Sequence, residues 1–404
     1  MRFMSVALCL LIVSRVSAQR PRADLKSLHN EHRWFELRDA VAQEGGTSFY
    51  RGIVECAFSQ LSECEADLHA AMASADKLDS IEAHRILISA YLRTGQYKAA
   101  QKEADALLAL TPNDSDTRGD YPLLELLGQS PDQIVESTGS SALQIQEHGL
   151  PVLISAKPAT YWFDTGANLS VMSESEARRL GLVTRTVESK VGVMTGAKVQ
   201  FRVAVANNVQ IGNSRLQNVA FLVFSDDQQP FSSLPEGSRG LLGMPILLAL
   251  GRVSFGPDRH FQITPKQIDS SSTHPNLCFD GKNPIALVEY AGRQLSFTLD
   301  TGATNTDLYP PFARSFPEVV RHGKTSSSKM EGVGSTDELY SVVLASLKLR
   351  IDQFSAVLHP ATVLLKENGE SSKYFYGNLG IDLLMQPRSV TIDFKNLRLS
   401  AQGQ

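Results

Sequence analysis

Two copies of the tetrapeptide Asp-Thr-Gly-Ala occur in this 404-residue chain, at residues 164–167 and 300–303. Each copy ends an apolar run that is typical of a strand. A glycine-bounded apolar segment follows each one at nearly the same distance, beginning at Gly240 after Asp164 and at Gly377 after Asp300. A single copy could be no more than an aspartate turn after a strand. Two pairs of landmarks at matching spacing indicate an internal repeat.

On these motifs the chain resembles the aspartic proteases of the retropepsin-like type, with two lobes fused in one polypeptide as in the pepsin-like enzymes. The resemblance covers about residues 140–400. It implies an all-β bilobal fold, in which each lobe supplies one aspartate loop and a glycine-bounded segment lies behind that loop. Residues 170–182 resemble the short helix after the first loop of bacterial relatives, with Ser173 ahead of Glu176 as a start signal and Gly181 as the end.

The resemblance makes Asp164 and Asp300 the catalytic residues. Two carboxyl groups in contact cannot both ionise cheaply, so the pair holds one proton over a wide acid range. The ionised member would act as a general base on water, and the protonated member as an acid toward the scissile carbonyl. This chemistry needs no metal and no cofactor. The nine histidines are scattered, and none joins the cysteines at the spacing of metal ligands.

Four further loop residues have expected supporting roles. Thr165 and Thr301 resemble the family's threonines that form hydrogen bonds across the lobe interface. Gly166 and Gly302 allow tight turns whose amides face the carboxylates. Both loops continue with alanine, where pepsin-like members often have a hydroxyl that lowers a catalytic pKa. We therefore expect a pH optimum that is acidic but milder than gastric pH.

A glycine-tipped hairpin, the flap, closes over the substrate in each lobe of this family. Glycine-containing segments downstream of each aspartate loop match these hairpins in position, although they could be ordinary hairpin turns. The candidate flap residues are Val193, Met194, Thr195 and Gly196 in the first lobe, and Val333 and Gly334 in the second.

Residues 24–118 have helical periodicity and almost no strand signal. Part of this segment resembles a tetratricopeptide repeat, with matches at Leu87, Tyr91, Gly95, Tyr97, Ala100 and Pro112. A weaker copy, one repeat length earlier in the chain, includes Tyr50, Ile53, Ala66 and Ala70. Such stacks commonly bind peptides or proteins on a concave face. The helices could recruit a partner, cover the cleft as an inhibitory lid, or serve only as a spacer.

Composition changes divide the chain further. Residues 1–18 read as a secretory signal peptide, with Arg2, an apolar core and small residues before the cleavage site. Export to the periplasm or the exterior follows, although an uncleaved anchor is an alternative. Residues 119–139 and 267–282 are expected linkers, rich in residues that break regular structure. They delimit a first lobe at residues 140–266 and a second lobe at residues 283–401.

Export makes the cysteines informative. Cys56 and Cys64 flank an expected turn between two helices, where they could form a disulfide in an oxidising compartment. Two small core residues between packed helices are an equally reasonable interpretation. Cys278 has no evident partner in the sequence.

The sequence supports two functions of different classes. The first is an exported aspartic endopeptidase that acts as a monomer, with its lobes paired within the chain and the helices recruiting substrate or regulating. The second is a peptide-binding scaffold with inactive lobes, which the two intact loops disfavour. Lobe pairing between chains would still give a protease. A net charge of −4 without a basic block argues against nucleic acid, and no apolar run reaches the ~20 residues of a membrane span.

Overall fold

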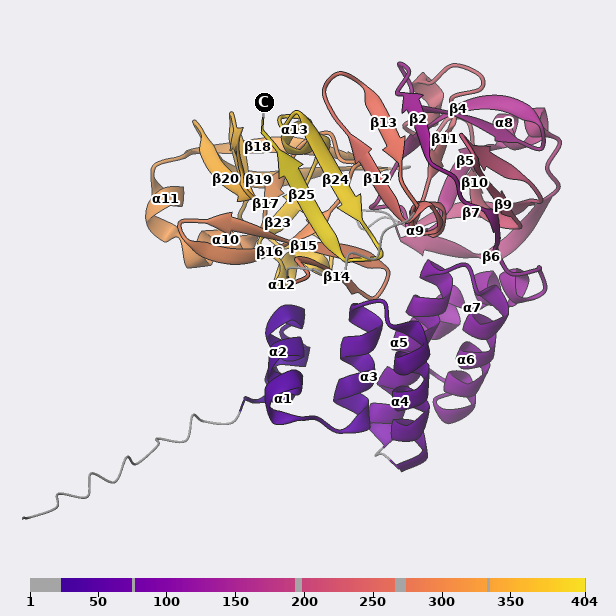
Figure 1. The fold of residues 1–404 in the computed structure, drawn as a ribbon, viewed down its shortest axis with the longest axis horizontal. Helices are drawn as coiled ribbons and strands as arrows, with labels where there is room; N and C mark the ends of the chain where they lie inside the picture. The colour runs from indigo at the N-terminus through magenta and orange to yellow at the C-terminus, as the bar shows by residue number, and fades with distance from the viewer. Residues whose placement is uncertain (1–22, 75–76, 193–197, 266–273, 333–334, 404) are drawn as a thin grey trace, which may run out of the picture.

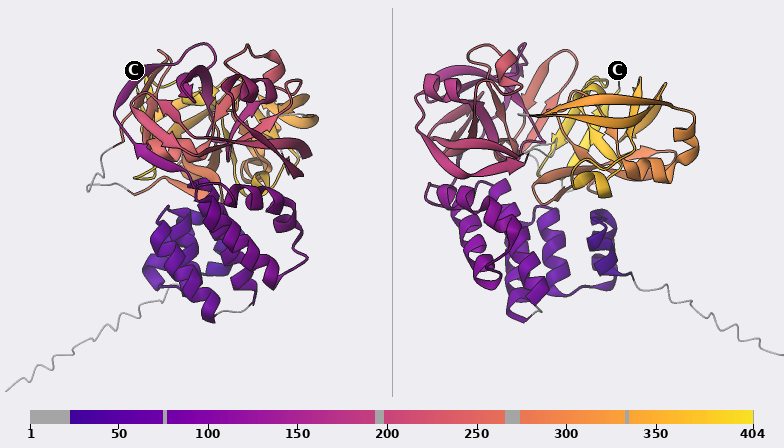
Figure 2. Two further views of the ribbon diagram at one scale, coloured as in Figure 1. Left: turned by 90° about the vertical axis from the view of Figure 1, so that its right-hand side faces the viewer. Right: turned by 180° about the vertical axis from the view of Figure 1, so that it is seen from behind.

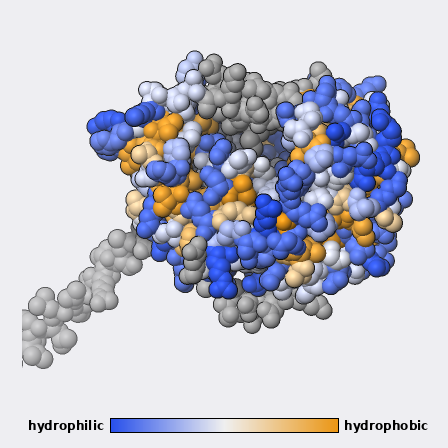
Figure 3. Space-filling view, turned by 90° about the horizontal axis from the view of Figure 1, so that it is seen from above, coloured by the Kyte–Doolittle hydropathy of each residue, from blue (hydrophilic) through white to orange (hydrophobic). Residues whose placement is uncertain are grey.

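The computed structural model describes residues 23–74, 77–192, 198–265, 274–332 and 335–403. A helical region comes first and a mostly β region follows, which confirms the coarse architecture predicted from sequence (Figure 1). The expected signal peptide, residues 1–18, lies outside the described residues. Within the described residues, no helix is both long and apolar enough to cross a membrane. The face of the β region seen from above is largely hydrophilic, with hydrophobic residues in small scattered patches (Figure 3).

Within the described residues, seven helices form the N-terminal region. They are α1 (Leu25–Asn30), α2 (Trp34–Glu44), α3 (Ser48–Ala57), α4 (Leu61–Ser74), α5 (Lys77–Arg93), α6 (Tyr97–Leu110) and α7 (Ser115–Gly128). Successive helices pack on one another, and the motif residues Leu87, Tyr97 and Ala100 are fully buried between them. The relation to tetratricopeptide repeats stays a prediction. Cys56 and Cys64 form a disulfide between α3 and α4, and both are also buried. Cys278 is free and buried.

The expected linker at residues 119–139 is instead largely ordered structure. Helix α7 begins before this segment, where the Asp114 side chain caps it by accepting a 2.9 Å hydrogen bond from the Thr117 N–H, and the helix continues into the segment as far as Gly128. Pro122 lies inside this helix. Strand β1 (Ile134–Ser137) follows and pairs with β9. The expected linker at 267–282 likewise contains a strand, β14 (Leu277–Asp280), which pairs with β15.

The strands of the β region that the structure describes form three sheets. The first sheet contains β1, β3 (Leu150–Ile154), β4 (Lys157–Phe163), β5 (Ser170–Ser173), β6 (Thr184–Gly192), β7 (Lys198–Ala206), β8 (Val209–Ile211), β9 (Ser214–Gln217), β10 (Val219–Phe224) and β11 (Gly240–Leu242). The second sheet contains β14, β15 (Asn283–Tyr290), β16 (Arg293–Leu299), β17 (Asp307–Leu308), β18 (Lys324–Gly332), β19 (Ser335–Leu344), β20 (Leu347–Ile351), β21 (Phe354–Leu358), β22 (Ala361–Leu364) and β23 (Gly377–Leu379).

The third sheet joins the two copies of the sequence repeat. This joining sheet has the strand order β2 (Ser141–Gln144), β13 (His260–Ile263), β12 (Arg252–Phe255), β24 (Ser389–Asp393) and β25 (Arg398–Gln402). Strand β12 belongs to the first copy and pairs antiparallel with β24 of the second. The ring of Phe163, the residue before Asp164, packs 5.0 Å from Phe255 and 4.9 Å from Phe261 on this sheet, centroid to centroid. The aspartate strand therefore rests on the sheet that connects the copies.

Short helices fill the connections of the β region. They are α8 (Glu174–Leu180), α9 (Met244–Leu250), α10 (Pro310–Ser315), α11 (Pro317–Arg321), α12 (Ser371–Tyr374), α13 (Ile381–Leu384) and the 3-10 turn Phe231–Ser233. The helix predicted after the first aspartate loop is confirmed as α8. The Ser173 side chain accepts from the Glu176 N–H at 3.3 Å, and Gly181 ends the helix at a φ of 76°, which favours glycine. Residues 170–173 form β5 rather than helix because they pair with β10 and β11.

The helical region lies beneath both parts of the β region and contacts each of them (Figures 1 and 2). On the side of the first sheet, the buried Tyr97 hydroxyl accepts a 3.1 Å hydrogen bond from the Ala220 N–H. On the side of the second sheet, His32 lies 2.8 Å from an Asp280 carboxylate oxygen. The helices are thus packed into the same folded unit as the sheets.

Candidate active site

Asp164 and Asp300 each follow the last residue of a strand, β4 and β16 respectively. Behind each loop lies the glycine-bounded segment of the same copy, because β4 pairs in parallel with β11, and β16 with β23. The backbone N–H of Asp164 donates to the Leu242 carbonyl at 2.9 Å, and that of Asp300 to the Leu379 carbonyl at 3.0 Å. The spacing seen in the sequence thus corresponds to one local structure formed twice.

Backbone amides of each loop turn toward their own carboxylate. The N–H groups of Gly166 and Ala167 donate to Asp164 Oδ1 at 2.8 and 3.2 Å. Those of Gly302 and Ala303 donate to Asp300 Oδ1 at 3.0 Å each. These bonds orient the carboxyl groups and favour their ionised forms.

The two loops are joined by reciprocal hydrogen bonds between their threonines. The Thr165 N–H donates to Thr301 Oγ1 at 3.1 Å, and the Thr301 N–H donates to Thr165 Oγ1 at 3.0 Å. Each hydroxyl in turn donates across the interface, Thr165 to the Leu299 carbonyl at 2.7 Å and Thr301 to the Phe163 carbonyl at 2.8 Å. Both threonines are buried, so the four bonds hold the loops in one geometry within a single chain.

This geometry brings the two carboxyl groups together. A Cβ atom added at Gly166 would lie 2.6 Å from Asp300 Oδ1, and one added at Gly302 would lie 2.5 Å from both Asp164 carboxylate oxygens. Glycine is required at both positions because each loop contacts the opposite aspartate. Burial and the neighbouring Asp300 charge raise the pKa of Asp164 well above its usual range. Burial also raises the pKa of Asp300, although hydrogen bonds from Asn378 and the loop amides oppose that shift.

Two functional contacts were not predicted from the sequence. The side-chain amide of Asn378 donates to Asp300 Oδ2 at 3.2 Å. The Trp162 indole N–H donates to the Thr301 carbonyl at 2.7 Å and ties the first strand to the second loop. Asn378 lies inside a glycine-bounded segment that the repeat already marked. Comparing it with Leu241, at the corresponding place in the first copy, would have singled it out.

Residues 150–246 match the family model of the aspartyl proteases. The matched segment includes the first aspartate loop and the glycine-bounded segment behind it. This part of the chain is therefore similar to an aspartyl protease domain, and the match supports protease chemistry there.

Similar solved structures include two retropepsin-type enzymes. One is a retropepsin-like aspartic protease from Rickettsia conorii, at 16% identity and a TM-score of 0.24, with 31% of this chain and 91% of that chain covered. The other is the EIAV protease complexed with the inhibitor HBY-793, at 22% identity and a TM-score of 0.20, with coverage of 29% and 90%. A comparison with curated proteins finds no match.

The predicted flap residues Val193, Met194, Thr195, Gly196, Val333 and Gly334 lie outside the described residues. The strands on either side of them are described and form two antiparallel hairpins, β6–β7 and β18–β19. Seen from behind, the β18–β19 hairpin extends toward the part of the molecule formed by the first copy (Figure 2, right). The assignment of these residues to flaps stays a prediction, and a role of either hairpin in closing over substrate stays a proposal.

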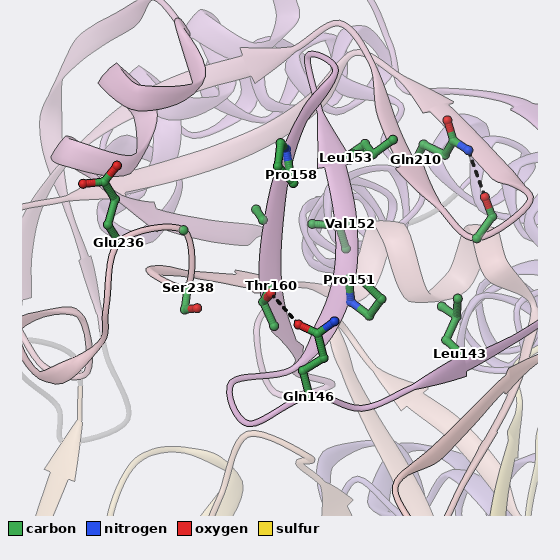
Figure 4. A pocket seen from close by; sticks show the side chains of 13 residues that line it. Leu143, Gln146, Pro151, Val152, Leu153, Pro158, Thr160, Gln210, Glu236 and Ser238 are labelled. Atoms are coloured by element: carbon green, nitrogen blue, oxygen red, sulfur yellow. Dashed lines mark hydrogen bonds between the residues drawn. The ribbon is translucent and has the colours of Figure 1, made fainter.

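A separate pocket of about 430 Å³ lies on the first sheet. Strands β3 and β4 supply Pro151, Val152, Leu153 and Pro158 to its lining, and the Thr160 hydroxyl donates to Gln146 beside it at 3.1 Å (Figure 4). Its lining includes neither aspartate loop. We therefore place the candidate active site at Asp164 and Asp300 rather than at this pocket.

Groups of three or more His, Cys, Asp or Glu side chains that could hold a metal ion do not occur among the described residues.

Proposed function

We propose that the protein is an aspartic endopeptidase in which Asp164 and Asp300 together activate water for peptide hydrolysis. One observation carries the proposal: two copies of the same loop, joined through Thr165 and Thr301, bring two carboxyl groups into contact within one chain. Two carboxyl groups this close share a proton, so the pair offers a base and an acid at the same point. Its ionisations belong to the pair rather than to either residue.

The reaction follows from this arrangement. The ionised carboxylate takes a proton from a water molecule, which attacks the peptide carbonyl carbon. The protonated carboxyl group donates a hydrogen bond to the carbonyl oxygen and then its proton, which stabilises the tetrahedral intermediate. The carboxyl group that received the water proton then donates it to the amide nitrogen, while the other carboxylate takes a proton from a hydroxyl of the intermediate. The C–N bond breaks, an acid and an amine are released, and the pair again holds one proton. The loop amides hold both carboxyl groups in place throughout. A flap formed by each of the two hairpins would exclude bulk water from the cleft.

Further parts of the proposal concern location and the helices. The Cys56–Cys64 disulfide supports export, because disulfides persist mainly in oxidising compartments. The apolar stretch at residues 1–18 supports the same conclusion.

We propose that the helical region recruits substrates or regulates cleavage. Helix α7 packs against β6, the strand that leads to the first candidate flap. The Arg185 guanidinium on β6 donates to the Ser130 hydroxyl and, at 3.4 Å, to the Leu126 carbonyl.

The proposal is tested with Asp164→Asn and Asp300→Asn. Each variant should lose peptide hydrolysis by at least about 10³-fold while remaining folded, because asparagine keeps the shape but cannot exchange the proton. Activity should survive a metal chelator, thiol reagents and serine-directed reagents. Substantial hydrolysis by either single variant would exclude the pair. Recovery on mixing the two inactive variants would show pairing between chains. Zinc-reversible inactivation by the chelator would exclude the mechanism.

The scaffold alternative makes a different prediction. A protein that only binds peptides should show no hydrolysis of an unstructured peptide library between pH 3 and 7, and a statine-type inhibitor should have no effect. The same assay gives the cleavage preference if the protein is an enzyme.

A further inference from the structure

The two copies of the active-site repeat can be compared residue by residue from strand register. In the first copy, Leu241 of β11 pairs with Trp162 of β4 and with Val171 of β5. In the second copy, Asn378 of β23 pairs with Thr298 of β16 and with Asp307 of β17. A pair of equivalent hydrogen bonds agrees with this alignment. The Gly243 N–H donates to Ser170 Oγ at 3.0 Å in the first copy, and the Gly380 N–H donates to Thr306 Oγ1 at 2.9 Å in the second.

The side chains at these equivalent positions differ in character. Trp162, Leu241 and Val171 are apolar or largely so. Their counterparts Thr298, Asn378 and Asp307 are all polar. Thr298 and Asn378 are buried and Asp307 is half-buried. A chain that only needed a second core of the same shape would have no reason to bury polar groups here, because each costs free energy unless it is hydrogen-bonded. The backbone of the pair is nearly symmetrical, but the surroundings of the two aspartates are not.

Two of these polar side chains, Thr298 and Asn378, form successive hydrogen bonds that end on Asp300. The Thr298 hydroxyl donates to Asn378 Oδ1 at 2.6 Å, and this leaves the Asn378 amide to donate to Asp300 Oδ2 at 3.2 Å. Asn378 is only 6% exposed, so water competes little for this bond. Asp300 thus accepts on both oxygens, Oδ1 from two backbone amides and Oδ2 from Asn378. Within the described part of the chain, the hydrogen-bond donors to Asp164 all reach Oδ1.

We propose, building on the proposed function, that Asn378 is a positioning residue that assigns the ionised state to Asp300, which makes Asp300 the general base and Asp164 the acid. A carboxylate oxygen accepts a hydrogen bond from an amide N–H more strongly than the protonated oxygen of a carboxyl group does, so a carboxyl group that accepts on both oxygens is stabilised as the anion. The shared proton then lies on the free oxygen of Asp164.

The titratable groups around Asp300 are consistent with this assignment. Asp164 faces it from the opposite loop, and Tyr309 and Asp307 lie on its own side. The pKa of Asp164 is raised well above its usual range, while the Asn378 hydrogen bond lowers the pKa of Asp300 against the effect of burial. Burial, together with the Asp382 charge, raises the pKa of Asp307 to about 6, so this group also titrates near the working range and has to be separated in the test.

The test replaces Asn378 by leucine, the residue at the equivalent position of the first copy. In Asn378→Leu, the fall of kcat/KM on the acid side of the pH profile should occur about one pH unit higher than in the unchanged protein. This shift corresponds to about a tenfold loss of kcat/KM on the acid side and to little loss at higher pH. Thr298→Val, which keeps the shape and removes the hydroxyl, should give a smaller shift in the same direction. Leu241→Asn is the matched control; it adds an amide on the side of Asp164 and should not move the limb upward.

A second readout does not depend on activity. In the Asp164→Asn background Asp300 titrates alone, and its carboxyl carbon can be followed by 13C NMR with and without Asn378→Leu. We expect the substitution to raise this pKa by about one unit. An unchanged pKa in the folded double variant would overturn the assignment, even if the enzyme is active. If the protein with both aspartates intact cuts no peptide but Asn378→Leu still raises the Asp300 pKa in this background, the assignment is kept and the proposed function is rejected. If Asn378→Leu does not fold, the same titration with Thr298→Val decides.

Discussion

The Arg93 guanidinium of α5 lies 4.2 Å from the ring centroid of Phe279 on β14, so a charged side chain of the helical region contacts the second sheet. It is 3% exposed and donates to the backbone carbonyls of Gly281 and Cys56, the latter at 2.9 Å. Burial lowers the pKa of Arg93 to about 10, which leaves it charged at neutral pH. A buried cation that bonds to carbonyls of both regions fixes the helices to the sheets.

Arg93→Ala should therefore destabilise the whole protein, by about 2–4 kcal/mol, because the buried Cys56 carbonyl and the Gly281 carbonyl lose their donor and a cavity forms. Arg93→Met should cost less, since it fills the space and removes the cost of burying the charge. Urea denaturation followed by circular dichroism measures both. A single transition with a lower midpoint is expected. Separate melting of the helical and β regions, with an unchanged β transition, would contradict a common folded unit.

Thr301→Val should weaken both stability and activity. Valine has nearly the same shape, but it cannot accept from the Thr165 N–H or donate to the Phe163 carbonyl, and both groups are left buried. We expect a loss of about 2–4 kcal/mol in the free energy of unfolding and a fall in kcat/KM. Thr301→Ser, which keeps the hydroxyl, is the control and should retain most of both. Equal losses for valine and serine would point to packing of the methyl group rather than to the hydrogen bonds.

Gly302→Ala tests how close the aspartates lie. The new methyl group would fall within about 2.5 Å of the Asp164 carboxylate oxygens, so the carboxyl groups must move apart. Displacements of this size can cost about 10²-fold in rate, and we expect at least that loss in kcat/KM. Gly119→Ala in α7, where an added Cβ meets nothing within 4 Å, should leave activity unchanged. Near-normal rates for Gly302→Ala would show that the carboxyl groups are not held in contact.

Asp307 allows a stability prediction that does not depend on catalysis. Its pKa is raised to about 6 by burial and by Asp382, so the folded state binds more protons than the unfolded state between about pH 4 and pH 6. The free energy of unfolding therefore falls as pH rises through this window. Above about pH 6 the full cost of burying the ionised Asp307 carboxylate remains. Asp307→Asn should remove up to about 3 kcal/mol of that cost at pH 7 and little of it at pH 4. Denaturation curves at both pH values measure the difference. An equal effect of Asp307→Asn on the free energy of unfolding at both pH values would refute the raised pKa of Asp307.

Much of the candidate site could be read from local sequence. A strand that ends in Asp-Thr-Gly turns tightly enough for its own amides to face the carboxyl group, and the second landmark repeats because the same backbone unit is built twice. The helix after Ser173 and its end at Gly181 follow from capping and from the left-handed backbone at glycine, which act over a few residues. The linker predicted at 119–139 shows the limit of this approach, since Pro122, a residue that usually breaks regular structure, is accommodated within a helix here.

The sequence by itself determined which residues form the candidate site and that they occur as a pair. Only the tertiary structure decided how the members of that pair differ. Asn378 reaches Asp300 because β23 lies between β16 and β17, and Arg93, the last residue of α5, reaches Phe279 because the helical region packs against β14 through α2 and α3. Both contacts join residues that are far apart in the sequence. Capping and turn formation depend on neighbours along the chain, whereas the free energy of a buried polar group depends on which distant partner reaches it after folding.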